Sequence, residues 1–115
     1  MKIRKELAKG STALLVLSIL SVRDMYGYHI IRELELLSEE VFQLNEGTLY
    51  PILHALEQEK CLSAYWEEAE DTGRRRKYYH ITQKGLKELE KQRQEWKTYA
   101  GAVEKVMGGT GFVIA

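Results

Sequence analysis

The fold is decided by the stretch SAYWEEAEDTGRRRKYYHIT, residues 63–82. Its first part, 63–68, contains two aromatic residues, and its last part, 77–82, contains two more together with β-branched residues, all of which favour strands. Between these parts, Asp71-Thr72-Gly73 supplies residue types that favour a turn. The stretch therefore predicts a β-hairpin.

Three helices are predicted ahead of this hairpin. Apolar residues cover nearly every side of the segment 11–21, which is typical of a helix enclosed by others. In the segment 26–39, apolar residues recur at helical spacing. We expect the third helix to begin with Thr48 as its N-cap and to end near Lys60. This start places Pro51 in the first turn, where its missing N–H is not needed.

A long helix is predicted after the hairpin, over 83–107, with Thr82 as its N-cap and with Gly108 and Gly109 at its end. Six of its residues are spaced alternately four and three apart, as in the a/d repeat of a coiled coil: Leu89, Arg93, Trp96, Ala100, Val103 and Met107. Nothing else in a chain of 115 residues could cover such a stripe along its whole length. We therefore expect a second copy to cover it in a homodimer.

This order of elements predicts a fold that is mainly α with a small β-hairpin. It is the order of a winged helix-turn-helix, expected over residues 1–82, followed by a dimerisation helix over 83–108 and a short tail over 109–115. In that fold, one helix enters the major groove of DNA, and the hairpin reaches a neighbouring backbone or minor groove.

Charge is segregated along the chain, although 17 Lys and Arg balance 17 Asp and Glu. The segment 72–87 holds only basic charges, and an acidic cluster precedes it at 67–71. Four basic residues lie at or just after the predicted turn: Arg74, Arg75, Arg76 and Lys77. They could bind phosphates through counterion release, adding affinity but little sequence information. Alternatively, they belong to a solvated turn and only balance the preceding acids.

The exposed start of the third helix offers small and polar groups: Asn45, Thr48, Tyr50 and His54. Thr48, Tyr50 and His54 would then make the contacts with base edges. Tyr50 and His54 lie off the apolar stripe of the helix, which predicts that they face outward. The segment could instead be only a capped helix start, with Tyr50 packed on the hairpin.

Other classes of protein are not favoured. A single cysteine, Cys61, cannot form an internal disulfide and points to a reducing compartment. The longest apolar run, 13–20, is too short to span a bilayer, and no secretory signal is visible, so we expect a cytoplasmic protein. The histidines and Cys61 match no zinc spacing, and carboxylates like those at 67–71 are usually solvated. We expect no metal, no cofactor and no catalysis.

The chain contains three motifs in a specific order and spacing: Met25-Tyr26-Gly27-Tyr28, Asn45-Glu46-Gly47-Thr48-Leu49-Tyr50-Pro51, and Arg75-Arg76-Lys77-Tyr78-Tyr79 followed by Thr82 and Gly85. Together they resemble the PadR family of bacterial transcriptional regulators, over about residues 7–107. The resemblance implies a homodimeric DNA-binding repressor. It also implies that Thr48 and Tyr50 lie on the recognition helix and that the arginines lie in the wing.

The resemblance further implies that a small hydrophobic or aromatic compound relieves repression by binding near the dimer interface. Trp96 would line that cavity, with Leu7 and Leu14 facing it from the first helix. Arg93 departs from the apolar side chain that such a cavity would prefer. Burial in a plain dimer core would also explain Trp96.

Two functions of other kinds stay open. The zero net charge and the acidic cluster favour a winged-helix protein-interaction module that does not bind DNA. Trp96 alone would fit a small carrier of aromatic compounds. In each case, we expect Trp66, Tyr78 and Tyr79 to pack the hairpin onto the helices, and Cys61 to be a small buried residue.

Overall fold

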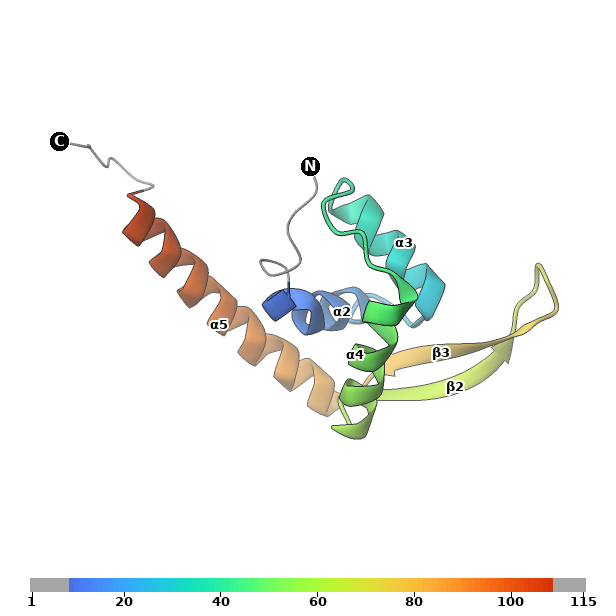
Figure 1. Ribbon diagram of the computed structural model, residues 1–115. Helices are drawn as coiled ribbons and strands as arrows, with labels where there is room; N and C mark the ends of the chain where they lie inside the picture. The colour runs from blue at the N-terminus through green and yellow to red at the C-terminus, as the bar shows by residue number, and fades with distance from the viewer. Residues whose placement is uncertain (1–8, 109–115) are drawn as a thin grey trace.

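The computed structural model describes residues 9–108, in which a group of helices packs beside a small sheet and a long final helix extends away (Figure 1). The elements, in chain order, are η1 (Lys9–Ser11), α2 (Thr12–Leu20), β1 (Met25–Tyr26), α3 (Gly27–Leu37), α4 (Glu46–Gln58), β2 (Leu62–Glu68), β3 (Arg75–Ile81) and α5 (Gln83–Met107). This is the predicted winged-helix architecture. Leu7 and the tail at 109–115 lie outside the described residues, so the roles expected of them stay predictions.

The sheet has three antiparallel strands in the order β1-β3-β2. β3 pairs with β2 along its whole length. Its other edge pairs with β1 through Met25↔Tyr79 and Tyr26↔Tyr78. The predicted two-stranded hairpin was therefore incomplete, because β1 had been placed at the start of a helix. A strand of two residues is too short to show the alternation by which strands are recognised.

Alternate residues along these strands face opposite sides of the sheet. Tyr79 faces the helices and is 1% exposed, whereas Tyr78 lies on the outer face and is half-buried. Trp66 is 57% exposed near the far end of the hairpin. Of the three aromatic residues expected to pack the hairpin onto the helices, only Tyr79 lies in the core. Tyr78 is on the outer face of the sheet, and Trp66 lies in the part of the hairpin that projects beyond the helices (Figure 1).

One apolar core joins α2, α3, α4 and the base of the sheet. Its largest fully buried side chains are Tyr79, Leu17, Leu20, Ile30, Leu49, Leu53 and Val16. Complete burial of an aliphatic side chain contributes about 1.5–3 kcal/mol to folding. Leu89 of α5 also belongs to this core and is 4% exposed. It lies inside the single chain, rather than on the surface where an intermolecular seam would need it.

The start of α4 differs from the prediction by three residues. Asn45, not Thr48, is the N-cap, because its side-chain oxygen accepts a hydrogen bond from the Thr48 N–H (2.9 Å). Asn caps helices at least as well as Thr. The negative charge of Glu46 in the first turn interacts favourably with the positive end of the helix dipole. Pro51 therefore lies in the second turn, and the carbonyl of Gly47 lacks its helical N–H partner.

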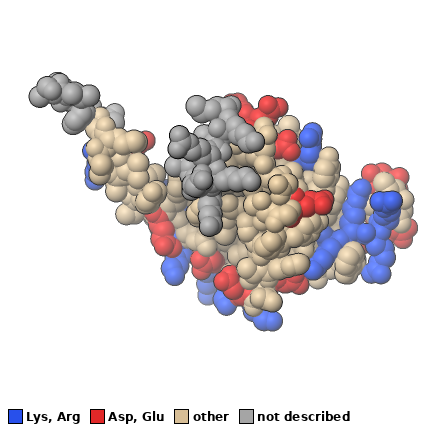
Figure 2. Space-filling view, viewed as in Figure 1, with Lys and Arg blue, Asp and Glu red and all other residues tan. Residues whose placement is uncertain are grey.

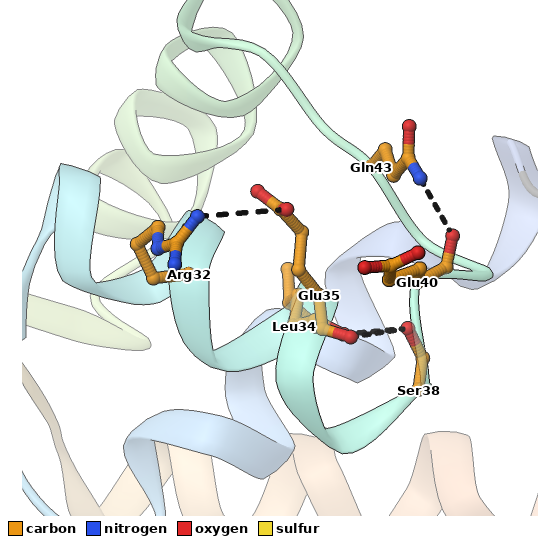
Figure 3. Close-up of polar contacts among 6 residues, drawn as sticks. All are labelled: Arg32, Leu34, Glu35, Ser38, Glu40 and Gln43. Carbon is orange, nitrogen blue, oxygen red and sulfur yellow. Dashed lines mark hydrogen bonds and ion pairs between the residues drawn. The ribbon is translucent and has the colours of Figure 1, made fainter.

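The connection from α3 to α4 is closed by short-range hydrogen bonds (Figure 3). The Ser38 hydroxyl donates to the carbonyl four residues before it (2.6 Å), and the Gln43 amide donates to the carbonyl of Glu40 (3.0 Å). α3 ends at Leu37, before the predicted end at Glu39. The reason is that Glu39 and Glu40 adopt left-handed backbone conformations, with φ of 52° and 69°.

α5 begins and ends where predicted. The Gly85 N–H donates to the Thr82 hydroxyl oxygen (3.0 Å), and Gly108 ends the helix with a φ of 72°. A Cβ atom at Gly85 would overlap the carbonyl of Cys61, so this glycine allows α5 to approach the chain before β2. Cys61 is 3% exposed, as predicted. Within the described part of the chain, no helix has the length and apolar character that crossing a membrane requires.

Candidate nucleic-acid interface

A cleft of about 590 Å³ separates the first half of α4 from the wing, by which we mean β2, β3 and the loop between them (62–81). α4 lines it with Glu46, Tyr50 and His54. The wing lines it with Trp66, Thr72, Arg74, Arg75, Arg76, Lys77 and Tyr79. Figure 2 shows Lys and Arg side chains gathered along the wing. The fold thus brings two of the predicted base-reading residues together with all four predicted basic residues.

The α4 side of this interface offers exposed polar groups. Thr48 and His54 are exposed, and Asn45 is exposed while it caps the helix. Glu46 is an exposed carboxylate at the helix N-terminus. Because the negative charge of Glu46 repels a phosphate at the N-terminus of α4, the wing is the better place for phosphate contacts.

Tyr50 does not face fully outward as predicted. It is half-buried, and its ring lies against Gly27 at the start of α3, where a Cβ atom would come within 2.5 Å of the Tyr50 hydroxyl oxygen. Burial, and then the negative charge of Glu46, raises the pKa of the Tyr50 phenol. Tyr50 therefore joins two helices while its ring lies 6.5 Å from that of His54 in the cleft.

Two of the four basic wing residues are engaged within the chain. The Lys77 ammonium lies 3.4 Å from a carboxylate oxygen of Glu57 on α4. The Arg76 guanidinium lies 3.5 Å from Asp71 and 4.3 Å from the ring centroid of Tyr26. These positive charges are already partly balanced, so they add less to phosphate binding than a free side chain would.

The other two, Arg74 and Arg75, are exposed and have no carboxylate within ion-pair distance anywhere in residues 9–108. Arg74 lies in the wing loop, and Arg75 is the first residue of β3, which begins two residues before the predicted strand start at Lys77. The Arg75 guanidinium lies 5.6 Å from the ring centroid of Trp66. Arg74 and Arg75 are therefore the basic groups best placed to meet phosphates.

The far half of α5 exposes an apolar face. Trp96 is 48% exposed, Tyr99 64%, Val106 86% and Met107 67%. Ala100 and Val103 are half-buried. The predicted stripe is thus present from Trp96 onward, on a helix that projects from the body (Figure 1).

Arg93 interrupts the stripe: it is exposed and lies 3.7 Å from Glu90. Beside the apolar face, a groove of about 540 Å³ lies between α2 and α5. Leu14, Trp96 and Tyr99 line it, as do the carboxylates of Glu88 and Glu95. The fold therefore brings together two of the three residues predicted to contact a ligand, and Leu7 lies outside the described residues.

A model of the transcriptional regulator PadR-like family matches residues 16–91 of the chain. The chain belongs to this PadR-like family. The matched region spans α2 to the start of α5, which includes the whole cleft described above. Members of the PadR-like family are transcriptional regulators, not enzymes, and this membership is consistent with regulation through DNA binding.

Solved structures of transcriptional regulators share the fold over most of the chain. A transcriptional regulator from Clostridium thermocellum aligns with a TM-score of 0.80 at 29% identity, covering 90% of this chain and 96% of its own. A PadR-like transcriptional regulator from Bacillus cereus aligns with a TM-score of 0.77 at 31% identity, covering 91% and 99%. The transcriptional regulator YqjI of Escherichia coli is 29% identical over 75% of this chain but only 39% of its own length.

Two residues that contact the wing were missed by sequence reasoning. Glu57, the partner of Lys77, is one of many surface carboxylates, and nothing in its local sequence distinguishes it. Asp24 contacts two residues of the wing that lie 41 and 56 positions away. Contacts at such separations leave no periodic signal in a single sequence.

Proposed function

We propose that the chain is a homodimeric repressor that binds double-stranded operator DNA through α4 and the wing. The observation that supports this best is the cleft that places Tyr50 and His54 opposite the unpaired Arg74 and Arg75. An α4 helix in the major groove would present Thr48, Tyr50 and His54 to base edges. The wing arginines would then meet phosphates of the same duplex.

Dimerisation is proposed through the exposed apolar face of α5. A monomer would leave Trp96, Tyr99 and Val106 in water together, at a cost of about 25 cal/mol for each Å² of apolar area. A second copy that covers this face would place two recognition helices about 34–36 Å apart, as a pseudo-palindromic operator requires.

We propose that a small hydrophobic or aromatic ligand binds in the groove between α2 and α5 and releases the protein from DNA. The volume of this groove, about 540 Å³, lies within the ordinary range for ligand sites, roughly 300–1,000 Å³. Tryptophan fluorescence tests this directly. A planar phenolic compound should quench the wild-type emission but not that of Trp96→Phe, which retains only Trp66. Equal quenching in both proteins would remove Trp96 from the site.

The DNA-binding proposal is tested by fluorescence anisotropy at low salt. A labelled duplex from the promoter region of its own gene is compared with a random duplex of equal length. Tighter binding to the promoter duplex is expected, and Tyr50→Ala should shrink the difference between the two duplexes. Absence of binding to either duplex would favour the protein-interaction module, with which the zero net charge is compatible.

A further inference from the structure

Asp24 joins three segments that are distant in sequence. It directly precedes β1, and its carboxylate accepts a hydrogen bond from the Tyr65 hydroxyl on β2 (2.7 Å). Its other oxygen lies 2.8 Å from Nδ1 of His80 on β3. One carboxylate therefore links the entry of β1 to both strands of the wing. We call this set of three residues the Asp24 clamp.

The contacts of the clamp continue as a row of rings across the outer face of the sheet. Tyr65 stacks on Tyr78, with centroids 5.7 Å apart and ring planes at 13°. Tyr78 meets Tyr26 edge to face at 5.6 Å. The Arg76 guanidinium then lies over Tyr26. The row thus connects Asp24 to the basic end of β3, next to Arg74 and Arg75.

The ionisation of these groups agrees with their geometry. Partial burial by itself would raise the pKa of the Asp24 carboxyl, but the hydrogen bonds with Tyr65 and His80 outweigh it and lower that pKa. The hydrogen bond to Asp24 raises the pKa of Tyr65 to about 12. The carboxylate and the neutral phenol therefore coexist over a wide range of pH.

We propose that Asp24 is a positioning residue that holds the wing at a fixed distance from α4 for DNA binding. This proposal rests on the proposed function, because the position of the wing matters only if the wing binds DNA. Asp24 does not line the cleft, so its effect on DNA binding would pass through the position of Arg74 and Arg75 in the wing. Without the clamp, the wing must be ordered as DNA binds, and this ordering lowers the affinity.

A first experiment measures the clamp without DNA, by limited trypsin digestion. The wing carries cleavage sites at Arg74, Arg75 and Arg76, and cleavage there requires local opening. Asp24→Ala should speed this cleavage roughly three- to tenfold, the range for loss of half-exposed hydrogen bonds to a charge. Asp24→Asn should fall between wild type and Asp24→Ala, because the amide oxygen still accepts from Tyr65.

Glu33→Ala is the matched control for this digestion. Glu33 is a carboxylate of α3 whose ion pairs are with Arg23 (3.9 Å) and His29 (3.7 Å) rather than with the wing. Its removal should leave the rate of wing cleavage unchanged. Wild-type cleavage rates in both aspartate variants would overturn the proposal, whether or not the protein binds DNA.

A second experiment is a double-mutant cycle measured on the promoter duplex at a temperature where all variants are folded. Asp24→Ala should weaken DNA binding several-fold in the wild-type background. In the Arg74→Ala/Arg75→Ala background it should have no further effect, because the groups through which it acts are gone. An equal loss in both backgrounds would mean that Asp24 only supports general folding, and would overturn the positioning role. A wild-type protein that does not bind DNA would refute the proposed function, and the digestion would still test the clamp.

Discussion

The hydrogen bond from Tyr65 to Asp24 has a consequence for stability at high pH. It raises the pKa of Tyr65 from 10.0 in the free residue to about 12. A group whose pKa is raised on folding adds stability that is complete below its unfolded pKa. That stability is lost as the pH rises through the folded value. The contribution of this phenol is therefore present at neutral pH and disappears between about pH 10 and 12.

Asp24→Asn should return the titration midpoint of Tyr65 from about 12 toward 10, because the asparagine carries no negative charge. NMR of ring-labelled tyrosine, assigned with Tyr65→Phe, measures the midpoint directly. The other tyrosines serve as internal controls. A Tyr65 midpoint that is the same in wild type and Asp24→Asn would show that the Asp24 carboxylate does not raise the pKa of Tyr65 in solution.

Gly27→Ala should destabilise the protein by about 1–3 kcal/mol, the usual cost of forcing an atom into a packed contact. The added Cβ atom would lie 2.5 Å from the Tyr50 hydroxyl oxygen, so Tyr50→Phe in the same chain should recover part of the loss. Gly101→Ala is the matched control, because nothing lies within 4 Å of its Cβ position. Urea unfolding measures the stability of Gly27→Ala, Gly27→Ala/Tyr50→Phe and Gly101→Ala. Equal stability of Gly27→Ala and wild type would contradict the close contact.

At the scale of elements, much of this fold could be predicted, because its signals are local. The limits of α5 follow from a Thr cap and a Gly stop. The start of α4 was misplaced because Asn45 and Thr48 are both good caps, and local rules cannot rank them when the proline lies so near. β1 was missed because its only signal is pairing with β3, more than 50 residues away.

In the candidate site, too, contacts between residues distant in sequence could not be predicted. The basic run from Arg74 to Lys77 was visible in the sequence, but its division into two engaged and two unpaired side chains depends on Asp71 and Glu57. The latter lies 20 residues from Lys77 and on another element. Charge counting along the chain cannot detect such pairs, since they are set by how α4 packs beside the wing.

This division predicts how the wing contributes to affinity. If Arg74 and Arg75 each meet one phosphate in each protomer, their replacement by alanine should reduce the slope of log K against log salt by about 3.6. The double variant Lys84→Ala/Lys87→Ala removes the same charge from the exposed start of α5 and should change the slope little. Salt titrations on the random duplex measure both. An unchanged slope in the arginine variant would exclude the wing from DNA binding.

At the scale of the whole molecule, the far half of α5 projects from the body and exposes large apolar side chains, which supports a second copy as the partner that covers them. Val103→Glu would place a charge at the middle of the proposed seam and should convert the dimer to monomers. Gln94→Glu is the matched control, because helical spacing places residue 94 on the opposite side of α5. Size-exclusion chromatography with light scattering distinguishes the two. Dimers of unchanged mass in Val103→Glu would place the interface elsewhere.

The central claim is that two copies present two α4 helices and two wings to one duplex. Sedimentation velocity of the protein at micromolar concentration, alone and with the labelled promoter duplex, tests it most directly. The expected result is a dimer on its own and a complex of two chains per duplex with DNA. Monomers in both samples, with a duplex that sediments alone, would contradict it.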